Sequence, residues 1–228
     1  MAVYAFLPCR EGSERVPKKN IKSFNEFDNG LVELKLKQLL ACSAIDKVIL
    51  STNDGEILDY AATIDNDKLI VHKRDDALCR SGTSTDELVA HALSLVTDGH
   101  ILWTHVTSPF INSEQYELII KDYFQKLESG YDSLMTTSLI HGFLWDKEGP
   151  VNYDRNKEKW PRTQTIEPIH EINSAVFLSS VTNYAILNDR IGKKPYLYVL
   201  NKIIAHDIDW PEDFIIAEAI AGNGLAKL

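Results

Sequence analysis

The sequence predicts an α/β fold with a mostly parallel sheet, and two observations support this prediction. Short apolar runs with β-branched and aromatic residues alternate along the chain with longer stretches of helical period. Strands separated by helices of this length imply right-handed crossovers, and hence a mostly parallel sheet that is covered on both faces. Ligands of such sheets bind beyond the carboxyl ends of the strands, so the loops that follow strands are the first candidates for a site.

The first part of the chain alternates regularly. Strands are expected at residues 2–8, 47–52, 68–73, 100–106 and 131–138, and helices at residues 31–44, 53–63, 84–96 and 113–127. Asn53 or Asp54 can cap the second helix, and Ser84 or Thr85 the third. These elements already make up most of one large domain.

The alternation stops after Ser138. Residues 139–171 lack a helical period and are rich in Pro, Asn and charge, yet they contain Trp145 and Trp160. An irregular segment of this length in a compact domain is a lid, a β-arm or a partner contact, although core packing explains either tryptophan equally well. Strands at 173–180 and 194–201 and a helix at 211–222 follow. We therefore predict one domain over residues 1–228 with an irregular insertion at about 139–171.

Composition and charge exclude several classes of protein. The chain carries 33 acidic and 24 basic residues, a net charge of −9, which argues against a nucleic-acid surface. No apolar stretch is long enough to span a membrane and the opening run does not resemble a signal peptide, so we expect a cytoplasmic protein without a membrane partner. The odd number of cysteines, without CxxC spacing, indicates neither disulfides nor a zinc site.

The loop after the first strand concentrates positive charge in this acidic chain. Residues 7–24, LPCREGSERVPKKNIKSF, hold two arginines and three lysines. The loop is neither a Walker loop nor a GxGxxG turn, because the required glycine and lysine spacings are absent. Its backbone amides, Gly12 and basic side chains can surround the phosphates of a small polyanion, whereas the alternative is a solvated, lysine-rich turn.

Two aspartates near the C-terminus form a candidate metal site. Asp207 and Asp209 occupy alternate positions, so on an extended segment their carboxylates point the same way. Two carboxylates suit Mg²⁺, which takes its remaining ligands from substrate phosphates and water. Asp209 could instead cap the helix that begins at Pro211, and spacing does not separate the two roles. His206 is not expected as a ligand, because Mg²⁺ favours oxygen.

Six motifs in order give a resemblance that covers nearly the whole chain. The loop reads RxGSxRxPxKNIK from Arg10 to Lys22. The others are STNDGEI (51–57), RDDALCRSGTSTDELVAHAL (74–93), HVTSPF (105–110), PRTQ with EINSAVFL (161–164 and 171–178) and DIDWPEDFIIAE (207–218). Together they resemble the acylneuraminate cytidylyltransferases, which activate sialic acid and related nine-carbon keto sugars as CMP-sugars. The resemblance implies a three-layer Rossmann-like nucleotidyltransferase fold with an inserted dimerisation arm.

The resemblance implies a reaction and roles for particular residues. The anomeric hydroxyl of the sugar attacks the α-phosphorus of CTP and releases pyrophosphate, and the protein positions the reactants and neutralises charge. The matching catalytic positions are Arg10, Lys19 and Asp209; those for the nucleotide are Arg10, Gly12, Ser13, Lys19, Asn20, Arg74 and Thr85. For the sugar they are His105, Ser108, Arg162, Gln164 and Asn173, with Mg²⁺ on Asp207 and Asp209. Ser108 could instead cap the following helix.

The partners implied are CTP, a nonulosonic acid sugar and a second subunit, with the irregular segment used for dimerisation and completion of the sugar site. Glu14, His105 and Ser174 depart from the family pattern, as do Ser81 and Gly82. They leave open which keto sugar is activated, and no general base is identified. The alternatives are a CMP-Kdo synthetase or another nucleotide-sugar pyrophosphorylase, and a nucleotide-binding protein without catalysis.

Overall fold

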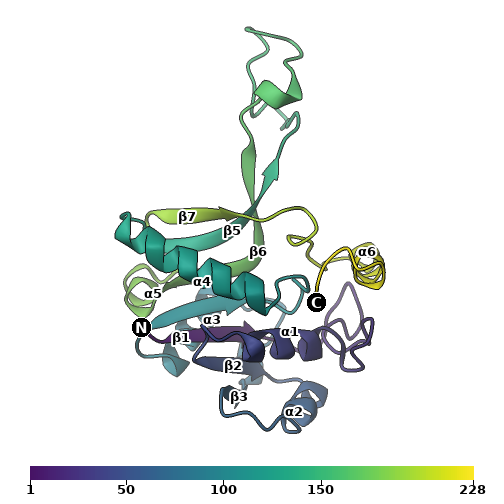
Figure 1. Cartoon of the computed structure of the whole chain (residues 1–228), viewed down its shortest axis with the longest axis vertical. Helices are drawn as coiled ribbons and strands as arrows, with labels where there is room; N and C mark the ends of the chain where they lie inside the picture. The colour runs from purple at the N-terminus through teal and green to yellow at the C-terminus, as the bar shows by residue number, and fades with distance from the viewer.

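The computed structural model describes residues 1–228 and contains one seven-stranded sheet (Figure 1). The strand order is β3-β2-β1-β4-β6-β5-β7. The strands are β1 (Val3–Pro8), β2 (Lys47–Thr52), β3 (Leu69–Lys73), β4 (His100–Thr104), β5 (Ser133–Ile140), β6 (Ile169–Ser180) and β7 (Pro195–Val199). All pairs are parallel except those of β6, which runs antiparallel to both β4 and β5. The predicted α/β fold with a mostly parallel sheet is confirmed.

Six α-helices accompany the sheet. They are α1 (Gly30–Ala41), α2 (Gly55–Ala61), α3 (Thr85–Leu95), α4 (Ser113–Glu128), α5 (Val181–Leu187) and α6 (Pro211–Gly222). Local sequence explains where several of them begin. Asp54 caps α2, and Ser84 and Glu87 form a reciprocal capping box at α3, which satisfies backbone N–H groups that have no partner within the helix. The sequence analysis missed α5, a helix of seven residues.

Alternating side chains of the strands divide the core between the two faces of the sheet. In β1, Ala5 and Leu7 pack with the apolar residues of α1 and α4, whereas Phe6 points to the opposite face. There it meets Trp103 of β4 at 4.8 Å between ring centroids, beside the apolar residues of α3 and α5. The predicted three-layer arrangement follows from this division. The three cysteines are free and buried, as expected of small core side chains.

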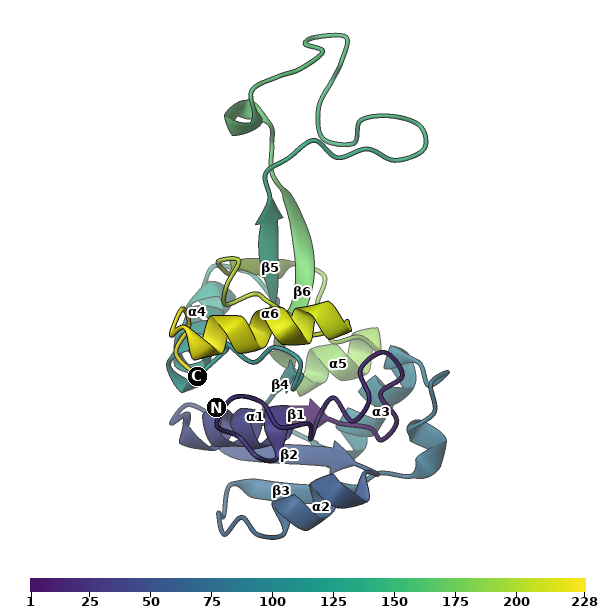
Figure 2. The same cartoon turned by 90° about the vertical axis from the view of Figure 1, so that its right-hand side faces the viewer.

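Residues 139–171 leave the body of the molecule as an arm. β5 and β6 continue past the sheet edge as a two-stranded ribbon, with register pairs that reach Ile140 and Ile169 (Figures 1 and 2). Trp145 and Trp160 are 53% and 66% exposed on this arm, so the alternative that they pack in the domain core is wrong. Their contacts are local, because Trp145 donates to the Tyr153 hydroxyl at 2.7 Å and Trp160 stacks edge-on with Phe143. No helix of the chain has the length and apolar character required to cross a bilayer.

Candidate active site

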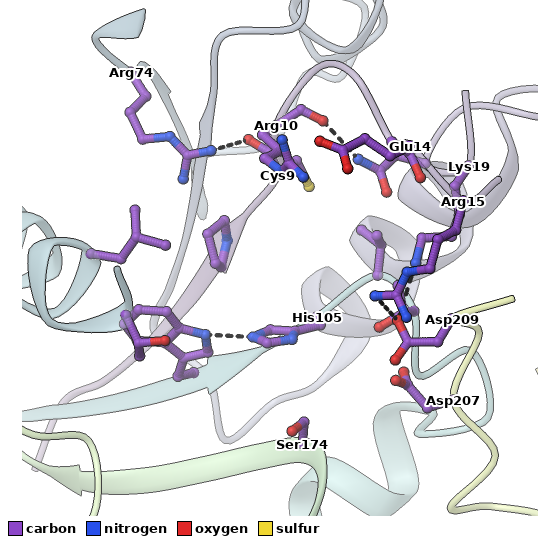
Figure 3. Close-up of a pocket in the computed structure, with 18 of the residues that line it drawn as sticks. Cys9, Arg10, Glu14, Arg15, Lys19, Arg74, His105, Ser174, Asp207 and Asp209 are labelled. Carbon is purple, nitrogen blue, oxygen red and sulfur yellow. Dashed lines mark hydrogen bonds and ion pairs between the residues drawn. The ribbon is translucent and has the colours of Figure 1, made fainter. Parts of the chain in front are cut away.

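A cavity of about 470 Å³ lies beyond the carboxyl ends of β1 and β4, where a parallel sheet places ligands. Seven segments contribute to it: the loop between β1 and α1, the end of β3, the start of α3, the end of β4, strand β6, the loop after α5 and the chain that precedes α6. In Figure 3, Arg74 lies at one end of the cavity, Asp207 and Asp209 lie at the other, and His105 lies between them. Sequence segments up to about 200 residues apart therefore share one concave, polar site.

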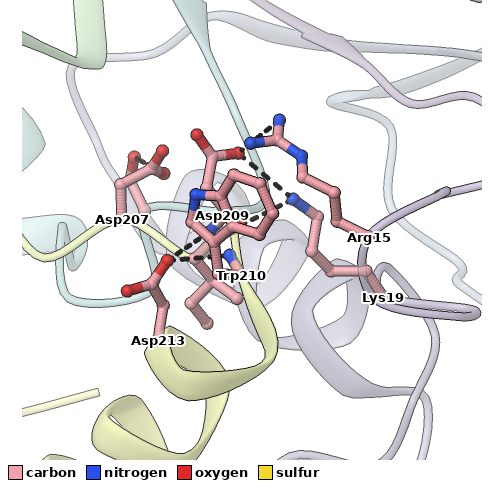
Figure 4. Close-up of polar contacts among 8 residues, drawn as sticks. Arg15, Lys19, Asp207, Asp209, Trp210 and Asp213 are labelled. Carbon is pink, nitrogen blue, oxygen red and sulfur yellow. Dashed lines mark hydrogen bonds and ion pairs between the residues drawn. The ribbon is translucent and has the colours of Figure 1, made fainter.

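The aspartate end of the cavity is held by charge contacts. Asp209 Oδ1 lies 3.2 Å from Arg15 Nη2 and 3.6 Å from Lys19 Nζ (Figure 4). Lys19 is almost fully buried and donates to the carbonyl of Ile208 at 2.6 Å. Burial lowers the pKa of Lys19, while Asp209 acts in the opposite direction. The opening loop thus brings its lysine directly against the acidic segment.

Asp207 and Asp209 both face the cavity, and the fully buried Ile208 between them points the other way, as alternation on an extended segment predicts. Burial raises the pKa of Asp207, which accepts a hydrogen bond from Ser108 Oγ at 3.4 Å. Asp209 does not cap α6. The N-cap residue is Trp210, and the carboxylate of Asp213 in the first turn reaches back and accepts from the backbone N–H groups of Asp209 and Trp210 (Figure 4).

The aspartate pair fits a magnesium ion that shares its ligands with a substrate. No group of three or more His, Cys, Asp or Glu residues is arranged to hold a metal on its own. Mg²⁺ is commonly bound by one or two carboxylates together with substrate phosphates and water, which is the donor set that Asp207 and Asp209 offer. The desolvated carboxylate of Asp207 would be stabilised by a nearby cation.

The opposite end of the cavity carries the predicted nucleobase residues. Arg74 is buried and donates through Nη2 to the Cys9 carbonyl at 2.6 Å and through Nε to Cys79 Sγ at 3.0 Å. Its Nη1 is buried without a partner, and a buried donor of this kind is costly unless a ligand accepts from it. Thr85 and Asn20 also line the cavity, and the Asn20 amide donates to the Arg10 carbonyl.

In the loop after β1, some of the residues predicted to bind phosphate line the cavity and others shape the backbone beside it. Arg10 and Ser13 line the cavity, and the Arg10 guanidinium makes no hydrogen bond or ion pair with the protein. Gly12 does not line it, but its φ of +80° is a conformation that favours glycine and that turns the chain between these two residues. Glu14 is exposed and lines the cavity as well, so a negative charge accompanies the basic side chains.

His105 lies in the wall of the cavity with a defined tautomer. Trp103 Nε1 donates to His105 Nε2 at 2.7 Å, and an indole N–H can only donate. Nε2 must therefore be unprotonated, and the ring proton of neutral His105 resides on Nδ1. Burial lowers the pKa of His105 to about 3, helped by the charge of Arg190, so the ring is neutral at physiological pH.

The remaining predicted sugar residues do not converge on this cavity. Ser108 is buried beneath it and supports Asp207, and α4 is capped by Asn112, so Ser108 is not the helix cap. Asn173 lines a second cavity of about 630 Å³, which meets the first at Ser174, Asp207 and Asp209. Arg162 and Gln164 are exposed on the arm and line neither cavity of their own chain.

The sequence analysis missed Lys35, which holds the floor of the site. Its fully buried ammonium donates to the carbonyls of Ser108 and Ile111 and to the Tyr116 hydroxyl, at 2.8, 3.2 and 3.0 Å. The Tyr116 hydroxyl can donate a hydrogen bond to Thr104 Oγ1, because the Thr104 hydroxyl itself donates to the Ala175 carbonyl of β6. Lys35 therefore donates three bonds, as an ammonium does, although burial lowers its pKa. Its position among the leucines at helical spacing on α1 was the available signal.

One further missed residue, Arg190, and an unanticipated backbone conformation at Ser174 lie on the same cavity. Arg190 lines it from the loop after α5, a region without a recognised motif. Ser174 adopts φ of +58°, a conformation that favours glycine and disfavours serine. The sequence comparison with the family pattern, which has glycine at this position, contained the signal for this strain.

Solved structures define the class of the fold. The CTP complex of CMP:2-keto-3-deoxy-manno-octonic acid synthetase is similar with a TM-score of 0.66 at 13% identity, over 98% of this chain and 99% of that chain. The 4-diphosphocytidyl-2C-methyl-D-erythritol synthase of Anaerococcus prevotii DSM 20548 is similar with a TM-score of 0.65 at 14% identity, over 97% and 96%. The chain therefore shares the fold of these two synthases.

The family follows from the sequence. The family model described as cytidylyltransferase matches residues 4–220, and the chain belongs to this family. It is 27% identical to the N-acylneuraminate cytidylyltransferase of Escherichia coli O18:K1:H7 over 224 residues, 96% of this chain but 52% of that protein. It is 23% identical to the pseudaminic acid cytidylyltransferase of Campylobacter jejuni serotype O:2, over 94% of both proteins. The chain thus spans about half the length of the Escherichia coli relative. The predicted resemblance is confirmed.

Proposed function

We propose that the protein transfers CMP from CTP to the anomeric hydroxyl of a sialic-acid-like nonulosonate and releases pyrophosphate. The observation that carries the proposal is the cavity in which the basic loop after β1 faces Asp207 and Asp209, with Arg74 at the other end. The two relatives named for N-acylneuraminate and pseudaminic acid support a nine-carbon sugar acid as substrate.

The cavity residues divide the work of the transfer. The sugar hydroxyl forms a bond to the α-phosphorus, the bond to the β-phosphate oxygen breaks, and the hydroxyl proton passes to solvent or a nearby oxygen acceptor. Arg10 and Lys19 neutralise phosphate oxygens, Ser13 and the turn at Gly12 shape the loop around them, and a guanidinium fork suits two oxygens at once. The protein contributes position and charge, which dominate catalysis of phosphoryl transfer.

Cytosine would occupy the end of the cavity near Arg74. The unpartnered Nη1 of Arg74 supplies a donor for an acceptor atom of the base, and the Asn20 amide and the Thr85 hydroxyl lie on the same cavity. We also propose that Asp207 and Asp209 hold Mg²⁺ together with substrate phosphates. When bound, the ion would neutralise charge that develops on the phosphate oxygens.

The arm supports a proposal about assembly. Exposed Trp145 and Trp160 are large apolar surfaces of the kind that anchor protein interfaces. Arg162 and Gln164 lie on the arm and line neither cavity of their own chain, so they would reach a sugar only in a second subunit. We therefore propose a cytoplasmic homodimer in which each arm completes the sugar site of the partner.

The experiment is pyrophosphate release from CTP and Mg²⁺ with a panel of nine-carbon and eight-carbon keto sugar acids. Release that depends on one nine-carbon acid, and that is lost in Asp209→Ala, is the expected result. The Asp65→Ala variant, at an exposed position outside both cavities, serves as the matched control. Release with only the eight-carbon acid would instead identify a Kdo synthetase, and CTP binding without release for every sugar would contradict the proposed transfer.

A further inference from the structure

Arg190 places an unneutralised positive charge in the wall of the cavity. Its side chain lines the cavity but forms no hydrogen bond and no ion pair with the protein. The carboxylate of the adjacent Asp189 accepts from the backbone N–H of Ile191 instead. None of the Arg190 nitrogens is among the buried polar atoms without a partner, so these donors are open to the cavity. The Arg190 donors are therefore available to an acceptor that enters the cavity.

Two aromatic rings hold this guanidinium in place. The Arg190 Cζ lies 3.8 Å from the centroid of the Phe177 ring and 5.3 Å from that of the Trp103 ring. Both rings belong to the core between the sheet and helices α3 and α5, where they are almost fully buried. Contact with two buried rings reduces the freedom that a free arginine would lose on binding. The guanidinium, whose N–H donors lie at the edge of its plane, is therefore positioned before any ligand arrives.

The same tryptophan fixes a second donor. Trp103 occupies Nε2 of His105, which leaves the Nδ1–H of His105 as the group available to a ligand. Nδ1 forms no hydrogen bond with the protein and is not sealed from solvent. A neutral His105 beside Arg190 adds a hydrogen-bond donor without adding a second charge. This pair therefore suits a group with two oxygen atoms and one negative charge.

We propose that Arg190, assisted by the Nδ1–H of His105, binds an anionic oxygen group of a bound substrate. The inference rests on the proposed function, which supplies two such groups: the carboxylate of the sugar acid and the phosphates of CTP. The carboxylate fits better, because Arg10, Arg15 and Lys19 already provide cations for phosphate on the loop after β1. Arg162, the expected partner of the sugar, lies outside this cavity in its own chain. Arg190 thus selects for sugars that carry an acid group.

The test compares Arg190→Gln, Arg190→Lys and Lys193→Gln. Lys193 is exposed on the same loop and does not line the cavity, so its variant removes one positive charge without touching the site. Calorimetry measures the affinity for CTP, and then for each sugar acid and its methyl ester in the presence of a non-transferable CTP analogue. Arg190→Gln should weaken binding of the acid by about 10- to 100-fold, the loss expected for a hydrogen bond to a charged group. Arg190→Lys should recover part of it, and Lys193→Gln should bind as the unchanged protein does.

The outcomes separate the two sources of the anion. A loss confined to the acid, with the ester and CTP unaffected, supports the carboxylate. A loss confined to CTP supports a phosphate. The proposal is overturned if neither affinity falls, or if acid and ester weaken equally, because Arg190 would then not recognise an anionic group. Thermal unfolding of each variant excludes general loss of structure as the cause.

Pyrophosphate release is measured in parallel and reports on the proposed function alone. Selective loss of acid binding without any turnover would leave the anion site standing and refute the transfer. Unchanged turnover in Arg190→Gln, together with unchanged affinities, would support the transfer and refute the anion site.

Discussion

Replacing Lys35 by methionine should destabilise the protein strongly, although this lysine touches no substrate. The change leaves three acceptors, the carbonyls of Ser108 and Ile111 and the Tyr116 hydroxyl, without their buried donor. Each unsatisfied group costs about 1–3 kcal/mol, whereas removal of a buried ammonium relieves part of that cost. We expect a net loss of roughly 2–4 kcal/mol, a large share of the ~5–15 kcal/mol that stabilises a typical protein.

For a chain of this size, 1 kcal/mol corresponds to a shift of roughly 2–4 °C in the unfolding midpoint. The Lys35→Met variant should therefore melt about 5–15 °C below the unchanged protein in a calorimetric scan. Its rate of pyrophosphate release should also be reduced at temperatures well below the melting range, because the Ser108 segment that contacts Asp207 loses its support.

Lys37→Met is the matched control. Lys37 lies two residues further along α1, where its exposed ammonium pairs with Glu33 at 2.7 Å. Surface pairs of this kind contribute about 0–1 kcal/mol, so this variant should melt within a few degrees of the unchanged protein. Equal midpoints for the two variants would refute the argument that Lys35 holds the floor of the site.

Three other predictions follow from the same structure. Ser174→Gly should raise the free energy of unfolding, measured in urea, by about 0.5–1 kcal/mol, because the strain of a left-handed serine exceeds the entropy cost of glycine. Asn188 is also left-handed, but asparagine tolerates this conformation, so Asn188→Gly should stabilise the protein less. Equal gains in the two variants would contradict the reasoning. Burial lowers the pKa of His91 to about 4 and of His105 to about 3, below the ordinary 6.5. The unfolded chain therefore binds these protons first, and each histidine should reduce stability by about 1.4 kcal/mol per pH unit as the pH falls below 6.5 towards these values. Urea titrations between pH 7.5 and 4.5 should show a smaller slope for His105→Gln, and an unchanged slope would exclude the assignment. Asp209→Asn should abolish pyrophosphate release without lowering the melting temperature, since it leaves the Asp213 cap intact; retained release would exclude Asp209 from the transfer.

The local sequence pattern was sufficient to predict most of the helices and strands. The apolar run from Lys47 to Thr52 was predicted with the bounds that the structure has, and the caps at α2 and α3 are among those expected from their side chains. These features depend on neighbours within a few residues, so periodicity and capping chemistry suffice to predict them. Helix α5 was not predicted, because its seven residues are too few for a helical period to be recognised.

By itself, the sequence determined the α/β class, the basic loop after the first strand and the alternate aspartates, because each of these is written in a continuous stretch of residues. Only the tertiary structure decided the antiparallel course of β6, since strand direction depends on partners in the sheet and not on local period. The same holds for Lys35 and Arg190, whose surroundings come from distant segments. A lysine on a helix or an arginine in a loop looks like ordinary surface in the sequence. Their roles arise from burial and from the absence of a counterion, which exist only once the chain has folded.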